Sequence, residues 1–200
     1  MDRIFASIAF TPTIKAIQSR LGSRQKYADF EVKGAEPAGL SQREVEFIAS
    51  CDSFYQATVS ETGWPYVQHR GGAEGFLKVL DTNTLGYADF RGNQQYVSAG
   101  NLANNDGIAL IMVDYPNRRR LKIMGHVHWV HLSDNPALFK RLVVPGYAGH
   151  IERGCIIRVE AWDWNCSKHI TPRYTEQTIE SRIAQYQQEN SAQQNILNTL

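Results

Sequence analysis

Apolar residues recur at helical spacing in the first fifty residues. Thr11 followed by Pro12 is typical of a helix start, and Gly22 is typical of a helix end. Between them, the apolar positions share one helical face: Ile14, Ile17 and Leu21. Ser41 and Glu44 have the spacing of a capping box, which predicts the start of a second short helix. The pattern therefore predicts a helical N-terminal segment.

From residue 54 the pattern becomes typical of β-strands. Aromatic and β-branched residues dominate residues 54–60, a turn follows at 61–63, and residues 66–70 predict the return strand of a hairpin. Further strand candidates are separated mostly by short turns: 76–80, 85–89, 108–113, 121–132 and 155–164. Short helices are predicted within 93–105 and from Pro136 onward.

The order of these elements predicts a mainly β fold with peripheral helices. We expect six short strands that form a small antiparallel barrel, and the missing alternation of strands and helices argues against a Rossmann domain. Three regions are expected: a helical extension packed on the barrel (1–50), the barrel itself (51–174), and a C-terminal helix with a frayed tail (175–200).

Composition narrows the class of protein. With 200 residues and 42% hydrophobic content, the chain can bury a core. Lys+Arg 21 against Asp+Glu 20 gives a net charge of +1, which argues against nucleic acid as a partner. Three scattered cysteines without a C-x-x-C pair predict a reduced, cytoplasmic protein. No stretch approaches the roughly 18 apolar residues of a membrane span, so we expect no membrane partner.

Three polar clusters stand at or just after predicted strand ends: residues 68–72, 89–95 and 118–122. Glycine in the first two lets backbone N–H groups approach an anion, and arginine binds phosphate through two parallel hydrogen bonds. The amide side chains of Asn93 and Gln94 match the mixed carbonyls and nitrogens of a flavin or pterin ring edge. Each cluster by itself is equally typical of a solvated hairpin tip.

Motifs for other chemistry are missing from the sequence. It contains no P-loop, no G-x-G-x-x-G and no G-x-S-x-G. His126 and His128 share one face of a predicted strand, but His131 has the opposite parity, so we predict no metal site. No catalytic residue is assigned; His69 is the best available proton donor because histidine titrates near neutral pH.

Taken together, residues 63–125 resemble the FMN-binding barrel core of the pyridoxamine 5'-phosphate oxidase-like family. The resemblance is strongest in four segments: 75–81, 91–98, 101–102 and 116–122. A later motif, at 162–166 and 169–174, is similar to one found in a bacterial subgroup of that family.

The resemblance implies a six-stranded antiparallel split β-barrel and a homodimer with FMN at the interface. It places the flavin and its phosphate along the second strand, at the turn and helix start after residue 89, and on the strand after residue 118. The implied cofactor-binding residues are His69, Arg70, Gly71, Asp89, Arg91, Asn93, Gln94, Gln95, Ser98, Arg120, Lys122 and Trp164.

The substrate is less determined than the cofactor. The oxidase has a Ser-Arg-Lys run in its phosphate turn, whereas residues 89–95 here contain no lysine, and its substrate-phosphate residues have no clear counterpart in 134–154. The leading hypothesis is an FMN-dependent oxidoreductase for an unidentified small molecule, with NAD(P)H as a possible electron donor. The alternatives are a non-catalytic carrier of FMN or haem, and a scaffold that has lost its ligand.

Overall fold

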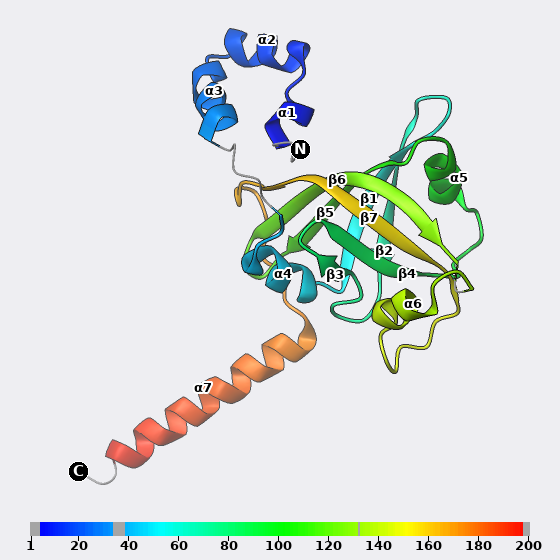
Figure 1. Cartoon of the computed structure of the whole chain (residues 1–200). Helices are drawn as coiled ribbons and strands as arrows, with labels where there is room; N and C mark the ends of the chain where they lie inside the picture. Colours follow the sequence, from blue (N-terminus) through cyan, green and yellow to red (C-terminus); the bar gives the residue numbers. More distant parts are fainter. Residues whose placement is uncertain (1–4, 34–38, 132, 198–200) are drawn as a thin grey trace. The chain divides into compact units, whose positions relative to one another are not determined.

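The computed structural model describes residues 5–33, 39–131 and 133–197 (Figure 1). The chain divides into two compact units, one of residues 1–113 with 120–165 and the other of residues 114–119 with 166–200. Four helices precede the first strand: α1 (Phe5–Ala9), α2 (Pro12–Arg20), α3 (Arg24–Lys33) and α4 (Gln42–Ala49).

The helix signals in the first fifty residues are confirmed. The Thr11 side chain accepts a hydrogen bond from the backbone N–H of Ile14 at 3.5 Å, and Gly22 follows α2 with a φ of +77°. Glu44 accepts a hydrogen bond from the backbone N–H of Ser41 at 3.0 Å, as a capping box requires. The packing of this helical extension on the barrel stays a prediction.

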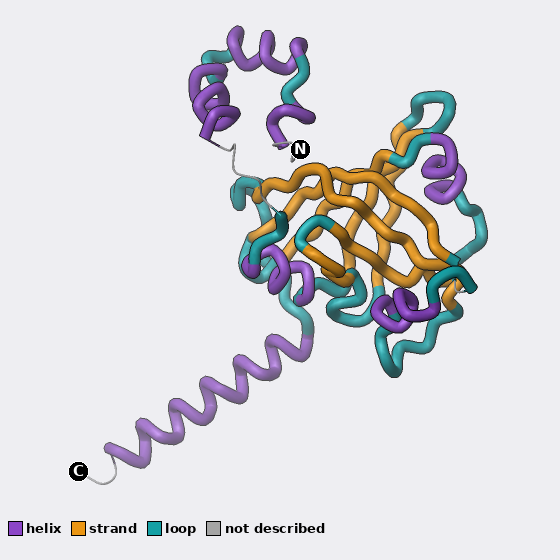
Figure 2. The backbone as a smooth tube through the Cα atoms, in the orientation of Figure 1, coloured by secondary structure: helices purple, strands orange, loops and turns teal. Residues whose placement is uncertain are grey.

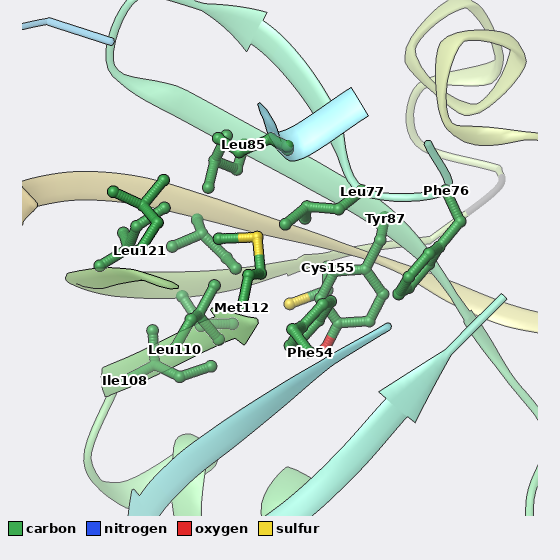
Figure 3. Close-up of a cluster of buried hydrophobic side chains, with 14 of the residues drawn as sticks. Phe54, Phe76, Leu77, Leu85, Tyr87, Ile108, Leu110, Met112, Leu121 and Cys155 are labelled. Atoms are coloured by element: carbon green, nitrogen blue, oxygen red, sulfur yellow. The ribbon is translucent and has the colours of Figure 1, made fainter. Parts of the chain in front are cut away.

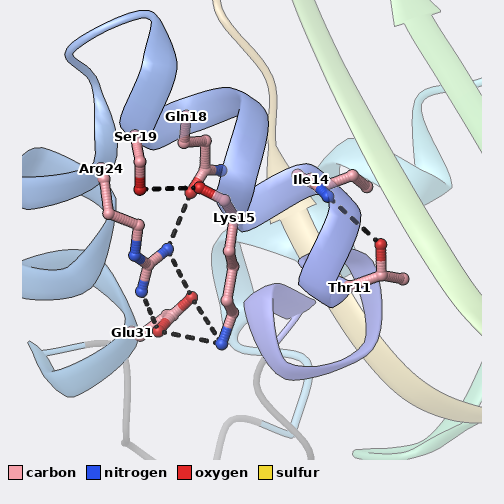
Figure 4. A network of polar contacts seen from close by, with 7 residues as sticks. All are labelled: Thr11, Ile14, Lys15, Gln18, Ser19, Arg24 and Glu31. Carbon is pink, nitrogen blue, oxygen red and sulfur yellow. Dashed lines mark hydrogen bonds and ion pairs between the residues drawn. The ribbon is translucent and has the colours of Figure 1, made fainter.

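Charged contacts join α2 to α3 (Figure 4). The Glu31 carboxylate accepts hydrogen bonds from Arg24 at 2.6 and 3.0 Å and forms an ion pair with Lys15 at 3.3 Å. Arg24 also donates to the side chain of Gln18 at 2.7 Å. The bonds from Arg24 hold the pKa of Glu31 below its ordinary value. Polar pairing therefore connects these two helices, and the apolar side chains of Ile14 and Ile17 on α2 are exposed.

Seven strands form one sheet, in which the neighbours are β2-β1-β5-β6-β7-β4-β3 (Figure 2). Their bounds are β1 (Ser53–Val59), β2 (Pro65–Gly71), β3 (Lys78–Asp81), β4 (Thr84–Phe90), β5 (Gly107–Asp114), β6 (Arg119–Val130) and β7 (Ile151–Trp164). The mainly β, antiparallel split-barrel fold is confirmed. The expected count of six strands is corrected to seven, because each of the seven strand segments recognised in the sequence, the short one at 76–80 included, has a counterpart in the sheet.

The barrel interior is one apolar cluster (Figure 3). The rings of Phe54 and Phe76 stack with their centroids 5.5 Å apart, and Tyr87 meets Phe54 edge-on at 5.4 Å. The Tyr87 hydroxyl donates a hydrogen bond to the buried Gln56 side chain at 3.1 Å. Burial raises the pKa of the Cys155 thiol to about 12, so this thiol stays protonated at neutral pH. Cys155 is therefore a core residue without nucleophilic character.

Three further helices lie outside the sheet: α5 (Val97–Asn104), α6 (Pro136–Leu142) and α7 (Glu176–Leu197). Within the second unit, Arg119 pairs with Asp114 at 2.7 Å, and the guanidinium of Arg173 lies 4.8 Å from the Tyr115 ring centroid. Helix α7 continues through Leu197. None of the helices in the described ranges is long and apolar enough to cross a membrane.

Candidate functional site

A polar cavity lies where β2, β4 and β7 meet the start of α5. Its volume is about 40 Å³, and it is lined by Tyr66, Gln68, Arg70, Asp89, Phe90, residues 92–99, Glu152 and Arg153. Strand alternation explains the contribution of β2, because Tyr66, Gln68 and Arg70 lie two residues apart and share one face. We call this hollow the anion cavity, for the reasons that follow.

A buried carboxylate organises two arginines in the wall of the anion cavity. Asp89 is 3% exposed and lies 2.8 Å from Nη1 of Arg70 and 2.9 Å from Nε of Arg153. The register of β4 and β7 places Asp89 directly opposite Arg153. The lining holds two arginines and two carboxylates, since Glu152 is also part of it. Nε of Arg70 is buried without a hydrogen-bond partner, which leaves a donor for a ligand oxygen. The arrangement favours an anionic ligand.

Helix α5 presents its N-terminal end to the same cavity. Residues 97–99, at the start of α5, line the cavity. The first backbone N–H groups of any helix have no acceptor inside that helix. These groups and the helix dipole favour a bound phosphate. The Ser98 hydroxyl, in the first turn, is held by a hydrogen bond to Gln68 at 2.8 Å. A helix start, a hydroxyl and two arginines therefore converge on one small volume.

The loop before α5 has an unusual backbone. Gln94 and Tyr96 have φ of 62° and 53°, a left-handed conformation that costs free energy in residues other than glycine. Arg91 and Tyr96, at the two ends of this loop, both contact the Glu152 carboxylate of β7 at 3.0 Å. The bond to Glu152 raises the pKa of Tyr96, while the bond from Arg91 lowers the pKa of Glu152.

The structure brings half of the predicted cofactor residues together. Six of them line the anion cavity: Arg70, Asp89, Asn93, Gln94, Gln95 and Ser98. Arg91 contributes to its wall through Glu152. Gly71 is exposed at the end of β2 and does not line the cavity.

His69, Lys122, Arg120 and Trp164 lie elsewhere. His69 is on the opposite face of β2 from Arg70, with its ring 5.4 Å from that of Tyr55. Lys122 pairs with Asp163 at 3.0 Å on β7 and lines a second, apolar hollow. Arg120, two residues earlier on β6, shares the face of Lys122.

Trp164 has partners in α4. Its indole N–H donates to the Glu44 carboxylate at 2.6 Å, and its ring packs edge-on against Phe47 with centroids 4.8 Å apart. The guanidinium of Arg43 lies 4.4 Å from the ring centroid. These contacts connect the last strand to the capping-box helix, and none of them involves the anion cavity.

The apolar hollow lies on the outer face of β1, β5 and β6. It has a volume of about 230 Å³ and is lined mainly by Phe5, Tyr55, Ala57, Val67, Ala109, Ile111, Ile123 and Met124, with Lys122 at its side. Tyr55 on β1 is 43% exposed and Val67 on the edge strand β2 is 62% exposed, so large apolar side chains border the hollow and face solvent. We call this surface the outer apolar face.

Sequence reasoning missed several residues of the anion cavity, chiefly Tyr96, Glu152 and Arg153. The last predicted strand began at residue 155, whereas β7 begins at Ile151. A charged pair at a strand start carries little strand signal, and only the pairing with β4 shows that Arg153 faces Asp89. Gln68 was within a recognised cluster, and its two-residue spacing from Arg70 was a usable signal.

In the described ranges, no group of three or more His, Cys, Asp or Glu side chains is placed to hold a metal ion. The fold and the anion cavity together define a split-barrel protein with a small polar cavity beside a helix start. A model of the pyridoxamine 5'-phosphate oxidase family matches residues 40–162, more than half of the 200-residue chain. The chain belongs to the pyridoxamine 5'-phosphate oxidase family.

The solved structures that match the chain are distant in sequence. HupZ from Group A Streptococcus is 16% identical, with a TM-score of 0.47, and the match covers 68% of this chain and 100% of that one. A putative pyridoxamine 5'-phosphate oxidase from Lactobacillus delbrueckii is 20% identical, with a TM-score of 0.46 and coverages of 62% and 93%. An FMN-binding protein from Syntrophomonas wolfei is 14% identical, with a TM-score of 0.45 and coverages of 74% and 97%. No curated protein matches the chain.

Proposed function

We propose that this protein binds FMN and that the FMN phosphate occupies the anion cavity. The observation that carries the proposal is the convergence of the α5 start, Arg70 and Arg153 on one small volume. The buried, unpartnered Nε of Arg70 is a donor that a phosphate oxygen would satisfy. Family membership supports the same ligand, and the residues present fit it.

The size of the cavity indicates how the flavin would lie. Sites for whole small molecules usually measure roughly 300–1,000 Å³, whereas the anion cavity holds about 40 Å³. It therefore suits the phosphate group, and the flavin ring would lie outside it. A ring in that position needs a second wall to exclude water.

We propose that a second copy of the chain supplies that wall, as a homodimer. The outer apolar face exposes Tyr55, Val67 and the hollow between them, and burying such a surface is the usual driving force for association. His69 and Lys122 lie on this face, so a partner's His69 and Lys122 would be available to the ring.

We propose an oxidoreductase for an unidentified small molecule. Bound FMN supplies the hydride- or electron-transfer chemistry, and this chain binds and orients it. Asp89 holds Arg70 and Arg153 in place, and Ser98 is oriented by Gln68. Among the described residues that line the anion cavity there is no histidine or cysteine, so no proton donor is assigned within it.

The same observation favours a second candidate, a protein that carries FMN without catalysis. A site that binds the phosphate and has no histidine or cysteine in its lining needs only to bind. Reduction of the bound flavin by NADH or NADPH, followed in an anaerobic cuvette, distinguishes the two. Bleaching of the flavin band in the presence of a donor supports the oxidoreductase, and a stable oxidised spectrum with both donors supports the carrier.

The binding proposal is tested by titrating purified protein with FMN and with riboflavin, following quenching of flavin fluorescence. FMN should bind more tightly, and Arg70→Ala should weaken FMN binding by about 10- to 100-fold, because a charge-assisted hydrogen bond contributes about 1.5–3 kcal/mol. Riboflavin, which lacks the phosphate, should be almost insensitive to that change.

The matched control is Arg158→Ala. Arg158 is on β7, its side chain is 67% exposed, and it pairs with Glu160 away from the anion cavity. This variant should bind both flavins as the unmodified protein does. Equal loss of FMN affinity in both variants, or an Arg70→Ala protein that binds FMN normally, would contradict the placement of the phosphate.

A further inference from the structure

Glu152 ties the loop of residues 91–96 to strand β7. Arg91 donates to its Oε1 at 3.0 Å, and the Tyr96 hydroxyl donates to the same oxygen at 3.0 Å. The Glu152 side chain is only 16% exposed, although the Arg91 side chain is 50% exposed. One carboxylate on a rigid strand therefore fixes both ends of a six-residue loop.

The loop needs such an anchor. Left-handed φ values at Gln94 and Tyr96 are unfavourable for these residue types, and a loop that adopts them must be held by its surroundings. Tyr96 is also the N-cap of α5, and it makes no side-chain capping bond to the helix. The direction in which α5 begins, and thus where its free N–H groups point, depends on the conformation of this loop.

A second set of contacts, made by Arg153, supports the same position of Tyr96. The Arg153 guanidinium lies 4.1 Å from the Trp129 ring centroid and 5.8 Å from that of Tyr96. Arg153 in turn bonds Asp89 at 2.9 Å. The anchored Tyr96 therefore borders the arginines that form the opposite wall of the anion cavity.

We propose that Glu152 is a positioning residue, which holds the 91–96 loop so that the start of α5 faces the flavin phosphate. The proposal rests on the proposed function, because it assigns Glu152 a role in that same site. Glu152 binds no phosphate itself; it acts through Arg91 and Tyr96.

The direction in which FMN affinity changes when Glu152 is replaced distinguishes a positioning residue from a bystander carboxylate. A carboxylate in the wall of a phosphate site repels the ligand, so removing its charge should strengthen phosphate binding if Glu152 were only a bystander. Positioning predicts the opposite, because the freed loop would lose the arrangement of N–H donors. Removal of the Glu152 carboxylate therefore weakens FMN binding if Glu152 is a positioning residue and strengthens it if Glu152 is a bystander.

The experiment measures the FMN dissociation constant of the unmodified protein, Glu152→Ala and Glu152→Gln by fluorescence quenching. Glu152→Ala should bind FMN about tenfold more weakly, the effect of roughly one lost charge-assisted interaction. Glu152→Gln keeps an oxygen acceptor for Arg91 and Tyr96, and its affinity should fall between the two. Unchanged or tighter FMN binding by Glu152→Ala would overturn the proposal.

Glu160→Gln is the matched control. Glu160 is on the same strand, its side chain is 18% exposed, and it forms an ion pair with Arg158 at 2.8 Å outside the anion cavity. This variant should keep the FMN affinity of the unmodified protein. A loss equal to that of Glu152→Gln would assign the effect to any charge change on β7 and overturn the proposal.

Amide hydrogen exchange on the flavin-free proteins tests positioning without the ligand. Residues 91–99 should exchange faster in Glu152→Ala than in the unmodified protein, while the core strands stay protected. Tyr96→Phe should accelerate the same segment, and adding it to Glu152→Ala should change little more, because Glu152→Ala already removes the hydrogen bond from Tyr96. Unchanged exchange of residues 91–99 in Glu152→Ala would overturn the proposal.

The two proposals fail differently. If the unmodified protein binds no FMN while Glu152→Ala loosens residues 91–99, the proposed function is wrong and the anchor is real. If the unmodified protein binds FMN and Glu152→Ala binds it equally well, the function stands and the positioning role is wrong.

Discussion

At the scale of single residues, Asp89 sets the character of the anion cavity. A buried carboxylate is costly unless it is paired, and Arg70 and Arg153 both pair with it. The guanidinium groups are held by this carboxylate, and their remaining donors are available to a ligand. The cavity is therefore organised before a phosphate arrives, which lowers the entropic cost of binding.

Glu152 gives the anion cavity a dependence on pH. The charged or titratable groups that face it are Arg91, Tyr96 and Arg153, and the bond from Arg91 is the main cause that lowers the pKa of Glu152 from 4.5. A carboxyl whose folded-state pKa is lowered stabilises the folded arrangement above its unfolded pKa and loses this effect as pH falls through the folded pKa.

We expect the 91–96 loop to loosen only below about pH 4.5, the ordinary value for Glu152. Fluorescence of a flavin-free sample, or exchange of residues 91–99 measured after brief exposure to different pH, follows the transition. In Glu152→Gln the transition should vanish from this segment. A loop that loosens equally in both proteins would show that another group titrates.

At the scale of elements, strand alternation and pairing decide which residues share a site. His69 and Arg70 are adjacent in sequence and so face opposite sides of β2, a separation that the two-residue period of a strand makes predictable. The meeting of Asp89 with Arg153 was not predictable in that way. They are 64 residues apart, and only the register of β4 and β7 brings them together.

The fold was more accessible to sequence reasoning than the site. Capping residues, turn glycines and β-branched runs act locally, so Thr11, Ser41 and the strand segments could be recognised from neighbouring residues alone. The residues that orient the predicted ligands act across the sheet. Trp164, expected beside the flavin, instead donates to Glu44, 120 residues earlier.

Gly125 tests the importance of strand register. The pairing of β6 with β7 shifts between Met124 and Gly125, and a Cβ on Gly125 would collide with the carbonyl oxygen of Arg158. Gly125→Ala should lower the free energy of unfolding by about 1–3 kcal/mol, as overpacking does. Urea denaturation followed by circular dichroism measures this change.

Gly100 is the control glycine for that measurement. It lies within α5, and a Cβ built on it meets no atom within 4 Å. Gly100→Ala should raise the free energy of unfolding by about 0.5–1 kcal/mol, because alanine is the better helix former. If Gly125→Ala were as stable as Gly100→Ala, the close approach at the bulge would not constrain the sheet.

At the scale of the whole molecule, the outer apolar face predicts association. Val67→Glu places a charge in the centre of this face, where Val67 is 62% exposed in the single chain. Light scattering should give a mass of twice 22.6 kDa for the unmodified protein and about 22.6 kDa for this variant. The monomeric variant should also bind FMN more weakly, because the flavin ring would lose the second wall that the partner supplies.

Lys140→Glu, on the exposed last turn of α6, is the control away from this face, and it changes the charge even more than Val67→Glu does. It should leave both the mass and the FMN affinity unchanged. An unmodified protein that is monomeric and binds FMN tightly would contradict the role given to the partner.

The central claim is that the anion cavity recognises the phosphate of FMN. The ratio of the riboflavin and FMN dissociation constants of the unmodified protein tests it most directly. Arg70 and the start of α5 act on the phosphate alone, so FMN should bind at least about 100-fold more tightly than riboflavin, the effect of roughly two charge-assisted hydrogen bonds. Equal affinities for the two flavins, or no binding of either, would contradict the claim.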